Sequence, residues 1–268
     1  PATEIICPQQ ELADNSKKSI KLQKWHNPME IFNTLADIKE PFADSFVTIG
    51  NFDGVHLGHH MLFSEVVSRA YQKQGTSVVV TFEPHPLQVI RPEIGIKLIS
   101  TYEQKVEMIS LAGLDVLVVI PFTRDFAATS AEAFVDEVLV RTIGVKELVV
   151  GYDYAFGKGR QGNIEFLKEQ GRLKGFPVTV VEPYYVDDML VSSSKIREMV
   201  REGRMMDVKK LLGRSYQIRV RSRKARKEAV LLSALKPPIC IYPRKTSVLN
   251  MECMLPRLSM TANVTAGF

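Results

Sequence analysis

Apolar residues in this chain follow two spacings. Consecutive apolar residues, typical of strands buried on both faces, predict strands at residues 45–51, 76–81, 116–120, 147–151 and 178–181. Apolar residues recurring every three or four positions predict helices at 28–38, 59–74, 100–112, 129–142, 163–174, 192–202 and 206–212. Two of these helices are expected to begin with capping boxes, Ser100 with Glu103 and Thr129 with Glu132.

This alternation of strands and helices predicts an α/β fold built on a doubly wound parallel sheet. Ligands of such sheets bind at the carboxyl ends of the strands, so the loops after those ends are where chemistry is expected. We expect a loose tail over residues 1–18, with a short strand at 19–23 opening a main domain that ends at 213. Residues 214–268 form a short basic segment in which strands at 215–220, 228–232 and 239–242 indicate a small β-containing appendage.

Composition narrows the class of protein. Of 268 residues, 45% are hydrophobic and 24% charged, which is typical of a globular domain. No apolar run approaches the roughly 20 residues that span a bilayer, and no secretory signal is visible at the N-terminus. The three cysteines have no metal-binding spacing, which favours a reduced, intracellular setting. We therefore expect a cytoplasmic protein, or one of an organelle matrix if the N-terminus is processed.

Positive charge is concentrated between residues 195 and 227, where 13 basic residues stand against 3 acidic ones. Such a run indicates either attraction for a polyanion or phosphate-rich ligand, or simply a solvated face. Binding of nucleic acid would need aromatic residues among the charges, and only Tyr216 is present. We therefore expect no nucleic-acid partner.

The most informative motif is GNFDGVHLGH, residues 50–59, which leaves a buried strand and enters a helix. Gly54 and Gly58 allow the backbone to approach a ligand closely, and the free N–H groups at a helix N-terminus suit phosphate. His56 and His59 can donate hydrogen bonds to phosphate oxygens and stabilise charge in a transition state. Capping histidines or a zinc site are the alternatives, but no third metal ligand stands nearby.

A second motif, VSSSKIR at residues 191–197, lies where a helix is expected to begin. Its serine hydroxyls can cap the helix or bind an anion. Lys195 and Arg197 oppose the helix dipole there unless an anion is bound, which favours a polyphosphate ligand over a plain serine cap.

Two further stretches carry candidate chemistry. Residues 157–162 match the GxGxxG pattern but do not leave a strand directly, so binding of NAD(P) is disfavoured, and the Walker A pattern also fails. This loop instead presents Asp153, Tyr154 and Phe156 to a flat ring or ribose, or packs its aromatics in the core, with Arg160 available to a phosphate. Within residues 81–86, Glu83 and His85 could be acid–base partners, although the rigid prolines more plausibly shape a pocket wall. Asp53 either binds Mg²⁺ or fixes the glycine-rich turn.

These motifs resemble a known family. Residues 50–59 are similar to the signature of the HxGH nucleotidyltransferase superfamily. In its longer form the signature resembles the FMN adenylyltransferase module of bacterial FAD synthetases, the bifunctional riboflavin kinase/FMN adenylyltransferase family. Residues 81–86, 151–162 and 191–197 resemble further motifs of that module, in the same order. The departures, Val191 for Ile and Ser194 for Thr, keep the chemistry.

The resemblance implies a Rossmann-like nucleotidyltransferase domain that converts ATP and FMN to FAD and pyrophosphate with Mg²⁺, and no membrane partner. The implied catalytic residues are His56, His59 and Arg197. The implied ATP-binding residues are Gly50, Asn51, Phe52, Gly58, His59, Ser193, Ser194 and Arg197. The implied flavin-binding residues are Pro84, Pro86, Asp153, Phe156, Gly157 and Arg160. No residue is assigned to the metal.

The C-terminal segment departs from the family pattern. The riboflavin kinase module of bifunctional relatives carries a Pro-Thr-Ala-Asn signature, and its nearest echo here, Thr261-Ala262-Asn263, lacks the proline. We therefore predict no riboflavin kinase activity. Two alternatives stay open: a superfamily member with another phosphate acceptor, and a flavin-nucleotide-binding protein without turnover.

Overall fold

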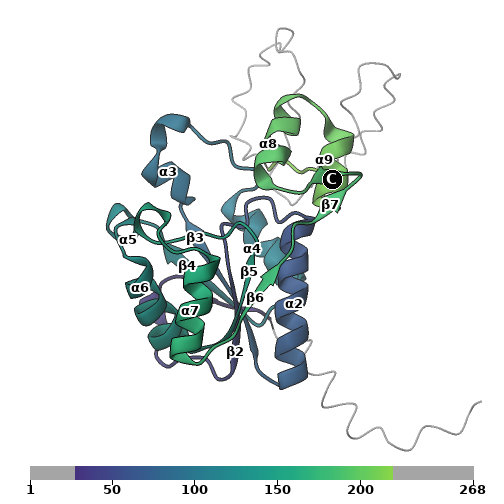
Figure 1. Ribbon diagram of the computed structural model, residues 1–268. Helices are drawn as coiled ribbons and strands as arrows, with labels where there is room; N and C mark the ends of the chain where they lie inside the picture. The colour runs from purple at the N-terminus through teal and green to yellow at the C-terminus, as the bar shows by residue number, and fades with distance from the viewer. Residues whose placement is uncertain (1–27, 220–268) are drawn as a thin grey trace, which may run out of the picture.

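A single parallel sheet organises the computed structural model, which describes residues 28–219 (Figure 1). Its strands lie in the order β1-β4-β3-β2-β5-β6, and every neighbouring pair is parallel. The strands are β1 (Glu30–Phe32), β2 (Ser45–Ile49), β3 (Thr76–Glu83), β4 (Val116–Pro121), β5 (Val145–Gly151) and β6 (Val178–Val181). The predicted doubly wound parallel sheet is therefore confirmed.

Helices supply the crossovers between strands and cover both faces of the sheet (Figure 1). One face packs against α2 (Leu57–Lys73) and α4 (Tyr102–Leu111). The other packs against α6 (Ala131–Ala133), the π-helix η4 (Phe134–Ile143) and α7 (Ile164–Lys174). Short helical turns lie in the loops: η2 (Leu35–Asp37), α3 (Pro86–Ile90), η3 (Pro92–Ile94), α5 (Arg124–Ala127) and η5 (Lys158–Arg160).

Consecutive strand residues serve the two faces in turn. On β3, Val78 and Val80 pack in the cluster formed with η4 and α7, whereas Val79 packs in the cluster formed with α2 and α4. All three side chains are fully buried. Because both faces are covered, the strand sequence is continuously apolar rather than alternating.

The strand order creates a crevice at one edge of the sheet. From β2 the chain moves outward through β3 to β4, then returns to place β5 on the other side of β2. The loops that follow β2 and β5 therefore leave the sheet in opposite directions, and ligands of doubly wound sheets bind at this switch point. The two loops contain residues 50–56 and 152–163, which carry two of the predicted motifs.

A small subdomain lies over the same edge of the sheet (Figure 1). It contains the antiparallel hairpin β7 (Tyr185–Val186) and β8 (Met189–Leu190), followed by α8 (Ser193–Arg201) and α9 (Met205–Leu212). A separate apolar cluster holds it together, with Ile196, Met199 and Leu211 fully buried beside Ile99.

The structure corrects several predicted elements. Residues 28–38 do not form the predicted helix. Glu30–Phe32 form β1, which pairs with the otherwise open edge of β4, a long-range contact that outweighs local spacing, and only the short turn η2 is helical. The helix caps are Thr101 and Ser130, each one residue later than predicted. The predicted strand at 215–220 is absent over its described residues, 215–219. The predicted elements at 1–18, 19–23, 228–232 and 239–242 lie outside the described residues.

Across residues 28–219, no helix combines the length and apolar character needed to cross a membrane.

We predict that the central strands dominate the stability of the domain. Leu117 on β4 is fully buried, so Leu117→Ala should lower the free energy of unfolding by about 2–5 kcal/mol in urea titrations. Leu111 on α4 is 80% exposed and serves as the matched control. Leu111→Ala should change the free energy by less than about 0.5 kcal/mol. Equal losses in the two variants would contradict this account of the core.

Candidate functional site

A cavity of about 840 Å³ opens at the switch point. The loop after β2, the segment from β3 into α3, the loop after β5 and the start of α8 all contribute to its wall. His56 and His59 therefore share one cavity with Ser193 and Arg197, although more than 130 positions separate the two motifs. The volume lies within the range of ordinary small-molecule sites.

The cavity brings together nearly all of the residues predicted for the site. Pro84 is the exception: it is exposed and does not line the cavity. The others contribute to its wall: Gly50, Asn51, Phe52, His56, Gly58, His59, Pro86, Asp153, Phe156, Gly157, Arg160, Ser193, Ser194 and Arg197.

The two imidazoles lie stacked at the start of α2. His56 is the N-cap, and its Nδ1 accepts the amide N–H of His59 at 3.3 Å. Because Nδ1 of His56 is an acceptor, the ring proton of the neutral imidazole must lie on Nε2. The rings of His56 and His59 are 3.5 Å apart at 19°, and Phe52 packs edge-on against His59. The helix cap thus fixes both the position and the tautomer of His56.

Burial keeps these imidazoles neutral. It lowers the pKa of His56 to about 3, with the positive charges of His60, Arg214 and Arg197 acting in the same direction. Burial, reinforced by His56, also lowers the pKa of His59 well below its ordinary value. At neutral pH each ring therefore offers a single N–H donor, which is what a phosphate oxygen requires.

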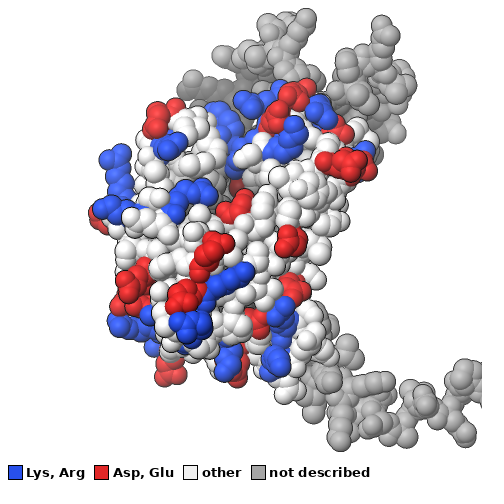
Figure 2. Space-filling view, in the orientation of Figure 1, with Lys and Arg blue, Asp and Glu red and all other residues white. Residues whose placement is uncertain are grey.

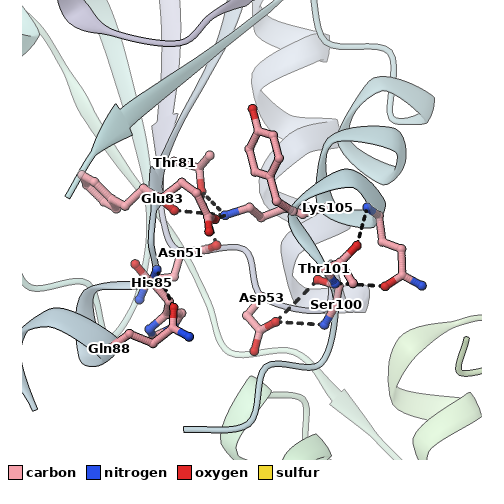
Figure 3. Close-up of polar contacts among 12 residues, drawn as sticks. Asn51, Asp53, Thr81, Glu83, His85, Gln88, Ser100, Thr101 and Lys105 are labelled. Carbon is pink, nitrogen blue, oxygen red and sulfur yellow. Dashed lines mark hydrogen bonds and ion pairs between the residues drawn. The ribbon is translucent and has the colours of Figure 1, made fainter. Parts of the chain in front are cut away.

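Asp53 joins the turn that carries the two histidines, residues 50–59 (the histidine turn), to α8. Its carboxylate accepts the backbone N–H of Ile99 at 2.9 Å. It also accepts the backbone N–H of Ser100 at 3.2 Å (Figure 3). The same carboxylate pairs with Arg197 Nη2 at 2.7 Å, and the Asp53 carbonyl accepts the Ser193 hydroxyl at 2.9 Å. Of the two hypotheses for Asp53, the structure supports the one in which it fixes the turn.

The basic residues at the start of α8 form ion pairs with carboxylates of the same chain. Ser192 caps the helix by accepting the N–H of Lys195 at 3.2 Å. Lys195 pairs with Glu198, and Arg197 with Asp53. The predicted conflict with the helix dipole is therefore partly relieved without a ligand. Arg197 Nε is buried without a hydrogen-bond partner and remains available for another acceptor.

Aromatic side chains form another part of the cavity wall, which we call the aromatic wall. Phe156 packs against Phe134 at 5.2 Å and stacks with Tyr154 at 5.6 Å and 18°. Gly162 makes this possible, because a Cβ there would come within 2.4 Å of the Phe156 ring. The wall continues with Phe82, Phe122 and Phe126. Such a surface suits a planar aromatic ring.

A lysine side chain holds the end of β3, and Glu83 and His85 do not pair with each other. Lys105 on α4 is buried and donates to Thr81 Oγ1, the Phe82 carbonyl and Glu83 Oε2 at 3.1–3.4 Å (Figure 3). His85 caps α3 by accepting the N–H of Leu87. Glu83 and His85 thus have separate structural partners, in line with the interpretation that this loop shapes a wall.

The GxGxxG stretch does not have a dinucleotide-binding geometry. Residues 157–162 follow β5 only after an intervening loop and form the turn η5. They close on themselves through a bridge between Phe156 and Gly162, and α7 begins only after Asn163 caps it. The stretch is part of the cavity wall.

The basic segment is largely neutralised where it is described. Arg204 pairs with Asp207, Lys210 with Asp187, and Arg219 with Glu107. Figure 2 shows positive and negative side chains interspersed over the visible face. Apart from Arg197, which lines the cavity, this arrangement over residues 195–219 favours a solvated face over a surface for polyanions.

The residues present do not form a metal-binding cluster. Within the described part of the chain, no group of three or more His, Cys, Asp or Glu side chains is placed to hold an ion. Asp53 is engaged by two backbone N–H groups and Arg197. A Mg²⁺ ion would therefore depend on phosphate oxygens for most of its ligands.

Comparison with known proteins matches this chain to one family model and to curated relatives that share one description. The family model described as FAD synthetase matches residues 38–195. The bifunctional riboflavin kinase/FMN adenylyltransferase of Buchnera aphidicola (subsp. Acyrthosiphon pisum, strain APS) is 35% identical over 71% of this chain and 61% of its own length. The enzyme of that description from Listeria monocytogenes is 32% identical over 81% of this chain and 66% of its own.

The chain spans about three fifths of the length of the first of these relatives. Among solved structures, a macrolide-efflux protein from Streptococcus pneumoniae has a TM-score of 0.62 at 27% identity. That match covers 70% of this chain and 62% of the other, and it supports the fold described above.

We predict that Asp53 stabilises the site more than an exposed ion pair could. Asp53→Asn removes the charge that Arg197 faces and should lower the free energy of unfolding by about 2 kcal/mol in urea titrations. Asp187, exposed and paired with Lys210, is the control, and Asp187→Asn should cost less than about 1 kcal/mol. A loss for Asp53→Asn no larger than the control's would contradict the linking role.

We also predict an acid-sensitive fold. The pKa of His56 is about 3 in the folded protein, against 6.5 for an exposed histidine. Below pH 6.5 the unfolded chain therefore binds a proton that the folded chain does not, and stability falls as pH falls. Between pH 7.5 and 5 this one group should cost on the order of 2 kcal/mol in chemical unfolding experiments. His56→Asn should lose correspondingly less over that range, and an unchanged loss would refute the assignment.

Proposed function

Because the chain belongs to the FAD synthetase family, we propose that it is an FMN adenylyltransferase, transferring AMP from ATP to the phosphate of FMN. The observation that carries the proposal is the shared cavity, where the N-termini of α2 and α8 meet an aromatic wall. A nucleoside triphosphate suits the first feature and a flavin ring the second.

The reaction needs positioning and charge stabilisation more than acid–base chemistry. A phosphate oxygen of FMN attacks the α-phosphorus of ATP and forms a new P–O bond. The bond between that phosphorus and the oxygen bridging to the β-phosphate breaks, and its electron pair leaves with pyrophosphate. The attacking phosphate is already anionic, so no side chain has to remove a proton. Holding the two substrates in line supplies much of the rate.

The two motifs take different parts in this step. His56 and His59 donate hydrogen bonds to the α-phosphate, whose oxygens gain charge in the transition state. Ser193, Ser194 and Arg197 hold the β- and γ-phosphates, which leave as pyrophosphate. The glycine-containing turn with Asn51 and Phe52 receives the adenosine side. These roles follow the family pattern and the placement of each residue on the cavity wall.

We assign the flavin to the part of the cavity that the aromatic wall lines. Pro86, Phe156 and Gly157 would face its ring, and Asp153 and Arg160, which are exposed at the mouth, would meet its polar end. Mg²⁺ would arrive on the triphosphate and screen its charge. The geometry of the protein requires no step through the ion.

We predict that both histidines are required for turnover. His56→Ala or His59→Ala should lower kcat for FAD formation from FMN and Mg·ATP by about 10²–10³, measured by flavin chromatography, with the fold intact. The neighbouring His60 does not line the cavity and is the matched control. His60→Ala should retain kcat within about twofold. Full activity in a His56 or His59 variant would contradict the assigned roles.

The same assay separates the alternative functions. Steady release of pyrophosphate with FMN excludes a flavin-nucleotide-binding protein without turnover. Release with another phosphate acceptor and not with FMN would identify a different nucleotidyltransferase. We also propose that riboflavin and ATP give no FMN, since the kinase signature is incomplete in this sequence. Formation of FMN would overturn that part of the proposal.

A further inference from the structure

The histidine turn has an unusual backbone. Phe52 and Val55 adopt positive φ angles of 48° and 37°, and Gly54 lies between them at 81°. A positive φ is sterically unfavourable for any residue with a Cβ, and most of all for a β-branched one such as Val55. Such conformations persist only where surrounding contacts hold them, and they concentrate at functional sites.

Two sets of contacts hold this turn from opposite sides. On one side, the Asp53 carboxylate binds the N–H groups of Ile99 and Ser100. On the other, Arg214 donates to the Gly54 carbonyl at 2.6 Å and to the Val55 carbonyl at 2.8 Å. Arg214 follows α9, which ends at Leu212, so it reaches the turn from 160 residues away in sequence.

Among the described residues, Arg214 donates hydrogen bonds only to main-chain carbonyls. Within residues 28–219 its hydrogen-bond acceptors are all carbonyl oxygens, the third being that of Leu212 at 3.2 Å, and it has no ion pair there. A partly buried cation without a carboxylate partner is costly to keep. Its neighbours in the same segment differ, because Lys210 and Arg219 pair with carboxylates at the surface.

The positive charge of Arg214, which has no carboxylate partner within residues 28–219, lies near the imidazoles of three histidines. It acts with burial to lower the pKa values of His56, His59 and His60. Burial is the main cause of the neutral form of these rings, and the charge of Arg214 reinforces it.

We propose that Arg214 is a positioning residue for the adenylyl transfer, holding the carbonyls of Gly54 and Val55 so that His56 and His59 face the α-phosphate. This inference rests on the proposed function. Like Arg197, Arg214 lies beyond residues 38–195, the part matched by the family model.

The guanidinium group is specific to this task. Its planar fork donates from Nη1 and Nη2 to two adjacent carbonyls at once, whereas a lysine ammonium is a point charge that cannot reproduce the fork. Arg214→Lys should therefore retain the charge and lose part of the geometry, and Arg214→Met should lose both. Arg219, exposed and bound to Glu107 on α4, provides the control Arg219→Met.

The test uses the full chain and two independent readouts. Hydrogen exchange measures the protection of the amides in residues 52–60, and steady-state kinetics measure FAD formation. In Arg214→Met we expect those amides to exchange at least tenfold faster, and kcat to fall by about 10–100-fold, the scale of a small misplacement of catalytic groups. The change in KM should be smaller than the change in kcat. Arg214→Lys should lie between this variant and the wild type, and Arg219→Met should match the wild type in both readouts.

The outcomes separate this inference from the proposed function. If the wild type makes no FAD, the proposed function fails and this inference fails with it. If the wild type makes FAD and Arg214→Met keeps kcat within twofold, the inference fails while the function stands. An equal kcat loss in Arg219→Met also overturns it. If Arg214→Met does not fold, Arg214→Lys decides: at an unchanged melting temperature, a kcat loss above threefold supports the inference and a wild-type kcat overturns it.

Discussion

The carboxylate of Asp53 is the contact on which the site depends. It lies in the loop after β2, is 3% exposed, and binds backbone N–H groups of the segment entering α4 together with Arg197 of α8. The hydroxyl of Ser193 and the guanidinium of Arg214 add directional bonds to backbone carbonyls of the same turn, whereas the apolar contacts of the small subdomain do not fix direction. These directional bonds, with those of the Asp53 carboxylate at their centre, hold the N-termini of α2 and α8 in place relative to each other. We propose that the cavity between those termini is the functional centre of the molecule.

A second theme is that the chemistry-bearing turn is supported by residues outside the motifs. Lys105 ties together the end of β3, and Arg214 holds the carbonyls of the histidine turn from beyond α9. Lys105 is buried and Arg214 partly buried, and each donates to at least one backbone carbonyl. Such contacts are local in space and distant in sequence, so they convert a flexible glycine-containing loop into a fixed arrangement.

The sequence predicted the parallel sheet well because its strands are continuously apolar, most of all β2, β3 and β4, which are buried over nearly their whole length. It failed at residues 28–38, where a three-residue strand forms only because the edge of β4 is available for pairing. The two imidazoles and the serine-led helix could be predicted from their motifs. Arg214 could not, because a lone arginine in a basic run carries no local signal of the carbonyls it will meet. The phenylalanines at 122 and 126 likewise acquire their role only when the sheet brings them to the wall formed by the loop after β5.

The central claim is that the histidine turn and the start of α8 together surround a nucleoside triphosphate. A crystal structure of the protein with a non-hydrolysable ATP analogue and FMN tests it most directly. The account predicts the α-phosphate within hydrogen-bond distance of His56 or His59, the β- and γ-phosphates at the N-terminus of α8, and the flavin ring against Phe156. A triphosphate bound elsewhere, or one that contacts only one of the two elements, would contradict it.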